Sequence, residues 1–451
     1  MLEKHNPLKI KKFLKKNSII LFTITFAGIF SNNFAKATVL NNSHKEVIDN
    51  VWQIIYRDFL DSSGKFKKSN WIELRKELLS KTYLNSDEAY DAIRDMLSSL
   101  DDDYTRFLDP KEFNQMKIDT SGELTGVGIQ IQKDEKSDYL IIVSPIEGTP
   151  AYNAGIKAKD KILSIDGIST KGMTLDDAVK LIRGPRGTKV KLEILRGSKS
   201  FFKDLLREKI ELKSVSSKLN RTKDGLLIGY VRITQFNANA SKETKDVIED
   251  LETKKVAGYV LDLRSNPGGL LDSSIDISRH FINQGIIVST VNKDGLKEIT
   301  RGNGQALTQK PLVVLVNEGS ASASEIVSGA IKDNKRGILV GKKTFGKGLV
   351  QSMRPLVDGS GLTVTVAKYL TPNGTDINKF GIVPDIEVKM NINPISQNEI
   401  GTRKDKQYRA GEKELINIIQ TENRKSQFNP ETKNLNVFLE IDKGNKVFSF
   451  N

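Results

Sequence analysis

Three short segments of the 451-residue chain carry residues that could perform chemistry, and each lies at or beside the end of an apolar run. They are residues 261–269 (LDLRSNPGG), 316–326 (VNEGSASASEI) and 343–351 (KTFGKGLVQ). In open α/β sheets, reactive groups gather where strands end and loops begin. A serine at a strand-to-helix turn lies at a helix N-terminus, where free backbone N–H groups can hold a developing oxyanion. Together the segments favour acyl transfer by a serine nucleophile.

A lysine near such a serine can act as its base only when the lysine is uncharged. Lys347 lies between Gly346 and Gly348, which let the backbone pack closely around it. Its pKa must fall from about 10.4 toward neutrality, and burial in a water-poor pocket can cause that fall. A Ser–Lys pair is a recognised variant of the catalytic triad and needs no histidine.

The composition excludes several competing chemistries. The chain has no Cys, so thiolate nucleophiles, disulfides and Cys-ligated metals are ruled out. Its three histidines, His5, His44 and His280, are far apart and show no metal-ligand spacing. We therefore expect no metal ion and no other cofactor. His280 is the one histidine of the expected core that could replace Lys347 as the base.

Each motif also has an ordinary structural interpretation. Residues 320–324 (SASAS) could only cap a helix, Lys347 could be a solvated loop lysine, and residues 267–269 (PGG) could be a plain turn. Glu325 could favour the first turn of its helix through the dipole, or pair with a cation. The combination of Lys347 and Gln351 downstream of the serines favours chemistry over these interpretations.

The segments belong to an expected α/β core at residues 209–390. Apolar strands alternate there with helical segments, as in sheets that are covered on both faces. Strands are expected at residues 229–233, 257–263, 311–316, 337–341 and 362–370, and helices at residues 241–251 and 324–332. Residues 391–451 are polar and basic, and we expect them to pack peripherally through residues 411–419 and 437–441.

We expect residues 119–208 to form a β-rich domain inserted before this core. Short β-like runs are separated by Gly and Pro, with one helix at residues 174–183. The order of these elements resembles a PDZ domain. The resemblance implies that the loop residues present backbone N–H groups to a peptide's terminal carboxylate while the peptide adds as a strand. Those loop residues are Gly126, Val127, Gly128 and Ile129.

The N-terminal region has two expected parts. Residues 1–37 have a basic start, an apolar stretch at 18–30 and small residues at 35 and 37, the layout of a cleaved secretory signal peptide. A retained anchor is the alternative, although the stretch is shorter than the ~20 residues a spanning helix needs. Residues 38–118 show helical periodicity and are expected to form a packed helical region without chemistry.

Much of the net charge of +14 belongs to the signal segment. Without residues 1–37 the chain keeps 63 basic and 55 acidic residues, a charge of +8. These charges are spread along the chain, without a basic stripe or nucleic-acid-binding motif, so we expect no nucleic-acid partner. The mildly basic remainder leaves peripheral contact with an anionic membrane open.

The motifs, their order and their spacing closely resemble the carboxyl-terminal processing, or tail-specific, serine proteases. The resemblance spans residues 47–388 and includes residues 100–108 (LDDDYTRFL), which match a motif before the PDZ domain, with Asp103 where many members have Pro. It implies Ser322 as nucleophile, Lys347 as base and Gln351 as the residue that helps to hold the lysine. It also implies that the backbone N–H groups of Gly268 and Ala323 form an oxyanion hole. It further implies Glu325 as a supporting residue and Arg183 as a sensor of bound peptide.

We therefore expect a multidomain exported endopeptidase, in the periplasm or thylakoid lumen, that binds free, apolar protein C-termini and cleaves C-terminal extensions through an acyl-enzyme. Similarity of residues 358–363 and 371–376 to family members of photosynthetic organisms points to a photosystem II reaction-centre precursor as substrate. Two alternatives remain, a broad degradative protease and a non-catalytic PDZ adaptor. Arg183 also has a plainer interpretation, as a cation at a helix C-terminus.

Overall fold

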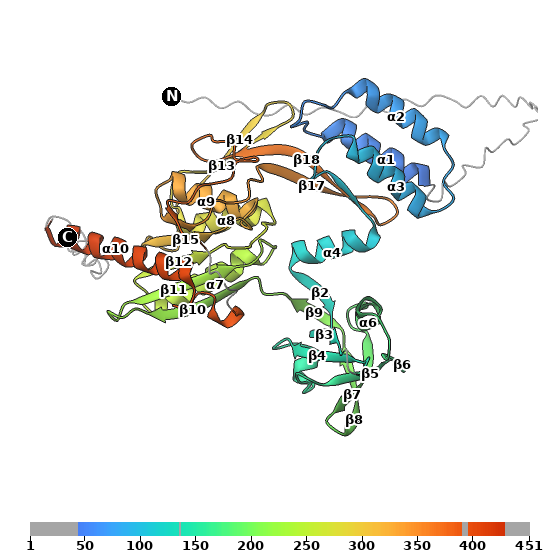
Figure 1. Ribbon diagram of the computed structural model, residues 1–451, viewed down its shortest axis with the longest axis horizontal. Helices are drawn as coiled ribbons and strands as arrows, with labels where there is room; N and C mark the ends of the chain where they lie inside the picture. The colour runs from blue at the N-terminus through green and yellow to red at the C-terminus, as the bar shows by residue number, and fades with distance from the viewer. Residues whose placement is uncertain (1–43, 135–136, 390–395, 429–451) are drawn as a thin grey trace, which may run out of the picture. The chain divides into compact units, whose positions relative to one another are not determined.

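The central sheet of the α/β core has six strands. The computed structural model describes residues 44–134, 137–389 and 396–428 (Figure 1), so the expected signal peptide and residues 437–441 lie outside the described part. The strand order is β10-β11-β12-β15-β16-β19, parallel except for β10. The strands are β10 (Val215–Arg221), β11 (Leu227–Ile233), β12 (Gly258–Asp262), β15 (Leu312–Val316), β16 (Ile338–Gly341) and β19 (Ile386–Glu387).

Both faces of this sheet are covered, which explains its continuous apolar strands. In β15 every residue is buried, and successive side chains enter different apolar clusters: Val314 packs with the helices of one face, and Val313 with the single helix of the other. The first face carries α7 (Ala240–Thr253), α8 (Leu271–Phe281) and α9 (Ala323–Asp333), and the second carries α10 (Lys406–Phe428), preceded by the short helix η1 (Gln397–Glu399). The predicted α/β core is confirmed.

A second, antiparallel sheet borders the site. β18 pairs with β17 along one edge and with β13 and β1 along the other, and β13 also pairs with β14. The helical region packs on this sheet, with Phe107, Leu362 and Val364 in its apolar cluster. The elements are α1 (His44–Asp58), α2 (Lys68–Ser80), α3 (Ser86–Ser98), β1 (Arg106–Leu108), β13 (Ile286–Asn292), β14 (Lys297–Arg301), β17 (Leu349–Pro355) and β18 (Gly361–Leu370).

The inserted domain has its own sheet and apolar cluster. It follows α4 (Pro110–Ser121), whose N-terminus is closed by a capping box between Asp109 and Glu112. Its sheet has the order β3-β4-β5-β7-β8, with β6 paired to β5. The elements are β2 (Glu123–Gly126), β3 (Ile129–Lys133), β4 (Leu140–Pro145), α5 (Pro150–Asn153), β5 (Lys161–Ile165), β6 (Ile168–Ser169), α6 (Leu175–Ile182), β7 (Lys189–Arg196), β8 (Lys199–Leu206) and β9 (Glu208–Glu211).

A buried ion cluster ties the C-terminal helix to the end of β12. Arg264 donates to Asp262 at 2.6 and 2.9 Å and to Asp405 at 2.6 and 2.9 Å, and all three side chains are at most 8% exposed. The two carboxylates raise the pKa of Arg264 above its ordinary value. Asp405 also accepts backbone N–H groups from Gly401 and Tyr408, which fixes the start of α10. The segment before the PGG turn is therefore held by one carboxylate from β12 and one from the start of α10.

No helix in the described ranges combines the length and the apolar character needed to cross a membrane.

Removal of Asp405 should destabilise the protein strongly, because the substitution leaves the buried Arg264 with one of its two carboxylates. We expect Asp405→Ala to lower the free energy of unfolding by roughly 3–5 kcal/mol, measured by urea denaturation. The matched control is Lys254→Ala, which breaks an exposed pair with Asp250 on α7 and should cost only about 0.3–0.5 kcal/mol. Equal effects of the two substitutions would contradict this account.

Candidate active site

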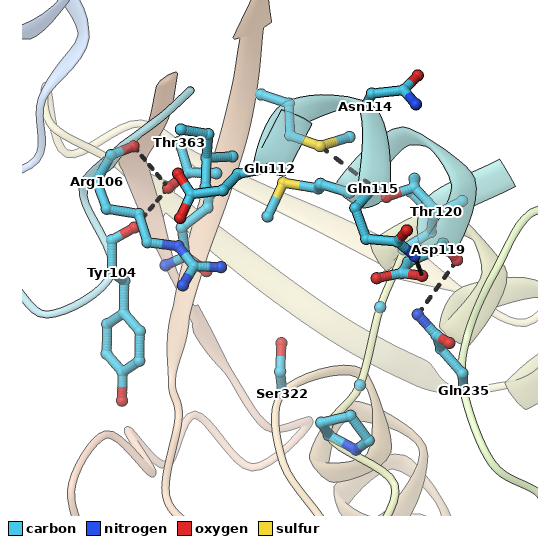
Figure 2. A pocket seen from close by; sticks show the side chains of 18 of the residues that line it. Tyr104, Arg106, Glu112, Asn114, Gln115, Asp119, Thr120, Gln235, Ser322 and Thr363 are labelled. Carbon is cyan, nitrogen blue, oxygen red and sulfur yellow. Dashed lines mark hydrogen bonds between the residues drawn. The ribbon is translucent and has the colours of Figure 1, made fainter. Parts of the chain in front are cut away.

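Ser322 lies at the turn between β15 and α9, immediately before the first residue of the helix. Its φ of 53° and ψ of −113° are unusual for a residue with a Cβ, a conformation that costs of the order of 1–3 kcal/mol and persists only when the surroundings fix it. The side chain lines a cleft whose walls include Tyr104 and Arg106, and it points into that cleft (Figure 2). The turn thus presents the predicted nucleophile to solvent-accessible space.

Glu325 joins the predicted nucleophile to the segment of the predicted base. Its side chain is fully buried and accepts four hydrogen bonds. One oxygen, Oε2, accepts the backbone N–H groups of Ser322 and Lys347, both at 2.9 Å. The other, Oε1, accepts the Thr344 hydroxyl at 2.5 Å and the Gly346 N–H at 2.7 Å. A buried carboxylate is costly unless such donors satisfy it, so these four bonds fix two loops against each other.

Tyr369 on β18 makes a second connection between the same two residues. Its hydroxyl donates to the Lys347 carbonyl at 2.5 Å and lies 3.1 Å from the Ser322 carbonyl oxygen. The side chain is 1% exposed, and burial raises the pKa of its hydroxyl well above the ordinary value, so the group stays a hydrogen-bond donor. Ser322 and Lys347 are consequently held to each other through their backbones.

Asn266 connects the PGG turn with the serine turn. Its backbone carbonyl accepts the Ala321 N–H at 3.0 Å and the Ser324 hydroxyl at 2.9 Å. Its side-chain Nδ2 donates to Ile233, and its Oδ1 accepts the Gly268 N–H at 2.9 Å. The backbone carbonyl of Asn266 thus joins the PGG turn to the start of α9, while its side chain fixes the turn itself.

The two predicted oxyanion donors, the N–H groups of Gly268 and Ala323, lie side by side, but they differ in their hydrogen bonding. Gly268 has a φ of 104°, and a Cβ there would lie 2.9 Å from Ser322 Cβ and 3.0 Å from the Ala323 nitrogen, so only glycine fits this approach. Among the described residues the Ala323 N–H has no hydrogen-bond partner, whereas the Gly268 N–H donates to Asn266. One donor is available, and the other would have to leave Asn266 first.

Lys347 lies largely buried in the same cleft. Burial, reinforced by the positive charge of Arg106, lowers the pKa of its amine, while Asp102 and Glu325 oppose that effect. Within the described ranges no hydrogen bond joins Lys347 Nζ to Ser322 Oγ, although both side chains line the cleft. The amine instead lies 4.6 Å from the centre of the Tyr104 ring.

Gln351 lies on the cleft wall at a β-bulge between Val350 and Gln351, which re-aims its side chain. Its Nε2 donates to the Thr365 hydroxyl at 3.4 Å rather than contacting Lys347. The Thr365 N–H donates to the Thr105 hydroxyl, which in turn donates to Asp102 at 2.6 Å. The segment at residues 100–108 is therefore connected to the strand that carries Gln351.

In the inserted domain, the loop that is predicted to bind a peptide's terminal carboxylate joins β2 to β3. β3 forms the edge of its sheet, so an added peptide strand has an unpaired partner there, and α6 packs beside it. Gly128 has a φ of 77°, and a Cβ would lie 2.3 Å from the Thr149 side chain. The helix itself is capped by Thr174, whose hydroxyl accepts the Asp177 N–H. Arg183 ends α6.

His280 is not positioned to replace Lys347. It lies in the last turn of α8, where its Nε2 is 3.0 Å from the Ser241 carbonyl oxygen and 3.2 Å from the Ser241 hydroxyl. Burial lowers the pKa of its ring, and it does not line the cleft. The described residues contain no group of three His, Cys, Asp or Glu side chains suited to a metal ion.

Sequence reasoning missed four residues that the structure places around the site: Asn266, Tyr369, Thr344 and Tyr104. Tyr369, Thr344 and Tyr104 act through tertiary contacts with no local sequence signal. Asn266 had such a signal, because the side-chain oxygen of an Asn in a turn often accepts the backbone N–H two residues further on, in an Asx turn.

Two family models match the chain, and they agree with this architecture. Residues 227–388 match peptidase family S41, and residues 115–195 match the PDZ domain. The fold and the family matches together define a serine peptidase that carries a PDZ domain.

Similar proteins narrow this class. A carboxyl-terminal-processing protease of Synechocystis sp. is 44% identical over 386 residues, 85% of this chain and 89% of the relative. The carboxyl-terminal-processing peptidase 2, chloroplastic, of Arabidopsis thaliana is 40% identical, over 74% of this chain and 67% of the relative. A solved structure of a photosystem II D1 C-terminal processing protease is 37% identical with a TM-score of 0.50, over 77% of this chain and 94% of that one. The chain belongs to the carboxyl-terminal-processing proteases.

Glu325→Gln should impair turnover more than substrate binding. An amide keeps the shape of the carboxylate but loses one acceptor oxygen, so it cannot accept all four donors, and the Ser322 and Lys347 segments lose their common partner. We expect kcat to fall by roughly 100-fold with little change in KM, measured by steady-state peptide cleavage. Glu318→Gln is the control, since Glu318 is 58% exposed and pairs with Lys342 at the surface. An unchanged kcat for Glu325→Gln would refute a positioning role.

Proposed function

We propose that this protease is exported and that it cleaves C-terminal extensions from protein substrates through an acyl-enzyme formed on Ser322, with Lys347 as general base. The observation that carries the proposal is the shared Glu325 oxygen, which accepts the backbone N–H groups of both residues at 2.9 Å. The lowered pKa of Lys347 supports the role of base, because a neutral amine can accept the proton of a serine hydroxyl.

The proposed reaction has two stages. Lys347 takes the Ser322 proton while the serine oxygen attacks the scissile carbonyl carbon, and the oxyanion binds the Ala323 N–H and, once released from Asn266, the Gly268 N–H. Lys347 then protonates the leaving amine, and the C-terminal fragment departs. A water that loses its proton to Lys347 attacks the ester, and the Ser322 oxygen leaves with that proton restored. Gln351 borders this cleft as a residue that supports the lysine.

Substrate selection is assigned to the PDZ domain. The N–H groups of the loop at Gly126–Ile129 would bind the terminal carboxylate, and an apolar tail would add beside β3. Export rests on the signal-like residues 1–37, and the named relatives of chloroplasts and cyanobacteria favour the thylakoid lumen or periplasm. The D1 precursor of photosystem II is the specific substrate that the related solved structure suggests.

Loss of either member of the dyad should abolish cleavage. We expect Ser322→Ala and Lys347→Ala each to lower kcat/KM by at least about 1000-fold, measured on a precursor with an apolar C-terminal extension. Lys343→Ala is the matched control, because Lys343 lies on the same loop but is exposed. Cleavage that survives Lys347→Ala would refute the lysine base.

The rate should rise with pH as Lys347 loses its proton. Because burial lowers the Lys347 pKa, the acid limb of kcat/KM should lie below the ~10.4 of an ordinary lysine. A rate profile over a pH series with the wild-type enzyme measures this limb. A limb at or above the ordinary lysine value would contradict a desolvated base.

A free C-terminus should be needed for efficient cleavage. Amidation of a peptide substrate removes the carboxylate that the PDZ loop would bind, so we expect an increase in KM of about 10-fold or more. Mass spectrometry of the products separates the alternatives: a single trimmed product supports processing, many products indicate degradation, and binding without cleavage indicates an adaptor.

A further inference from the structure

The amine of Lys347 has a specific contact that the proposed chemistry does not use. Its Nζ lies 4.6 Å from the centroid of the Tyr104 ring, within the range in which a cation is attracted to an aromatic face. Tyr104 lines the same cleft as Ser322 (Figure 2), yet it reaches the site from the segment before the PDZ domain. The contact therefore joins the proposed base to a distant part of the chain.

The backbone of Tyr104 is held by two hydrogen bonds. The Thr363 hydroxyl of β18 donates to the Tyr104 carbonyl at 2.9 Å, and the Tyr104 N–H donates to Asp102 at 3.1 Å. Asp102 also accepts the Thr105 hydroxyl at 2.6 Å. Because the backbone on both sides of Tyr104 is held in this way, the ring projects into the cleft from a fixed main chain rather than from a loose loop.

The charged groups around Lys347 come from two elements. Asp102 and Arg106 lie on the same segment as Tyr104, and Glu325 lies on α9; Arg106 disfavours the ammonium form, and the two carboxylates favour it. Arg106 is exposed toward the cleft and makes no side-chain hydrogen bond or ion pair within the described ranges. Tyr104 and Arg106 thus act on the amine in opposite directions.

We propose that Tyr104 is a positioning residue for Lys347, whose ring face holds the ammonium form of the amine in the cleft until it is deprotonated and reaches Ser322. This inference rests on the proposed Ser322–Lys347 dyad. The attraction of a ring face is for a cation, so it weakens when the proton leaves. Deprotonation of Lys347 and its movement to Ser322 are thereby coupled, and the amine is released in the form that can act as a base.

The test measures the rate at which a fluorophosphonate probe labels Ser322 as a function of pH. This probe reacts with the activated serine hydroxyl and has no C-terminus for the PDZ domain to bind. We expect Tyr104→Leu to move the acid limb of labelling to lower pH by roughly 0.5 to 1 unit, because the ammonium form loses its ring. Tyr104→Phe keeps the ring face and should leave the limb in place.

Arg106→Gln provides a control of opposite sign. Removal of a neighbouring positive charge raises the pKa of Lys347, so the limb should move to higher pH, by a few tenths of a unit for a group exposed to solvent. General loosening of the cleft would not shift the two profiles in opposite directions. If Tyr104→Leu unfolds at the assay temperature, Tyr104→Met tests the same loss of the ring with a flexible apolar side chain.

The failure of this inference can be told from the failure of the dyad. Lys347→Ala must abolish rapid labelling and its pH dependence; if it does not, the proposed base is wrong. If Lys347→Ala behaves as expected but the limb of Tyr104→Leu coincides with that of wild type or moves to higher pH, the role of Tyr104 is refuted. The role of Tyr104 would also be refuted if Tyr104→Phe shifted the acid limb of labelling as far as Tyr104→Leu does.

Discussion

The arrangement of the site depends on one buried carboxylate. Glu325 has no contact with solvent, so its charge is tolerable only while all four donors point at it. Those donors come from the serine turn and from the loop at residues 344–347. A displacement of either segment would expose an unsatisfied charge to an apolar interior. The cost of that state, rather than any direct contact between the reactive side chains, keeps Ser322 and Lys347 in the same cleft.

Each of the two sheets supplies part of the site around this carboxylate. The central sheet ends in the serine turn and the PGG turn, which Asn266 joins through its backbone carbonyl. The antiparallel sheet supplies β17 and β18, and with them Gln351 and Tyr369. The site therefore forms between turns at strand ends of the central sheet and strands of the antiparallel sheet. The bonds of Glu325 and Tyr369 hold the main chains of Ser322 and Lys347.

The sequence predicted the fold and several candidate site residues, but not their connections. Alternating apolar strands and helices were sufficient for the α/β core, because both faces of the central sheet are covered. Ser322, Lys347 and Glu325 could be proposed from spacing and from family resemblance. Tyr369 and Tyr104 could not, because their contacts depend on strand pairing between segments distant in the chain. The resemblance implies the Gly268 N–H as an oxyanion donor, and in the structure this N–H donates to the Asx turn of Asn266.

The ion cluster of Arg264 has a consequence for the order in which the molecule is built. Arg264 lies two residues before Asn266, yet one of its two carboxylates, Asp405, belongs to the start of the last described helix. A growing chain that has not reached residue 405 cannot complete this cluster, and its PGG turn lacks the support seen here. The turn that borders Ser322 thus gains this support only after residue 405 has been synthesised, so the active site depends on a segment far beyond its own residues.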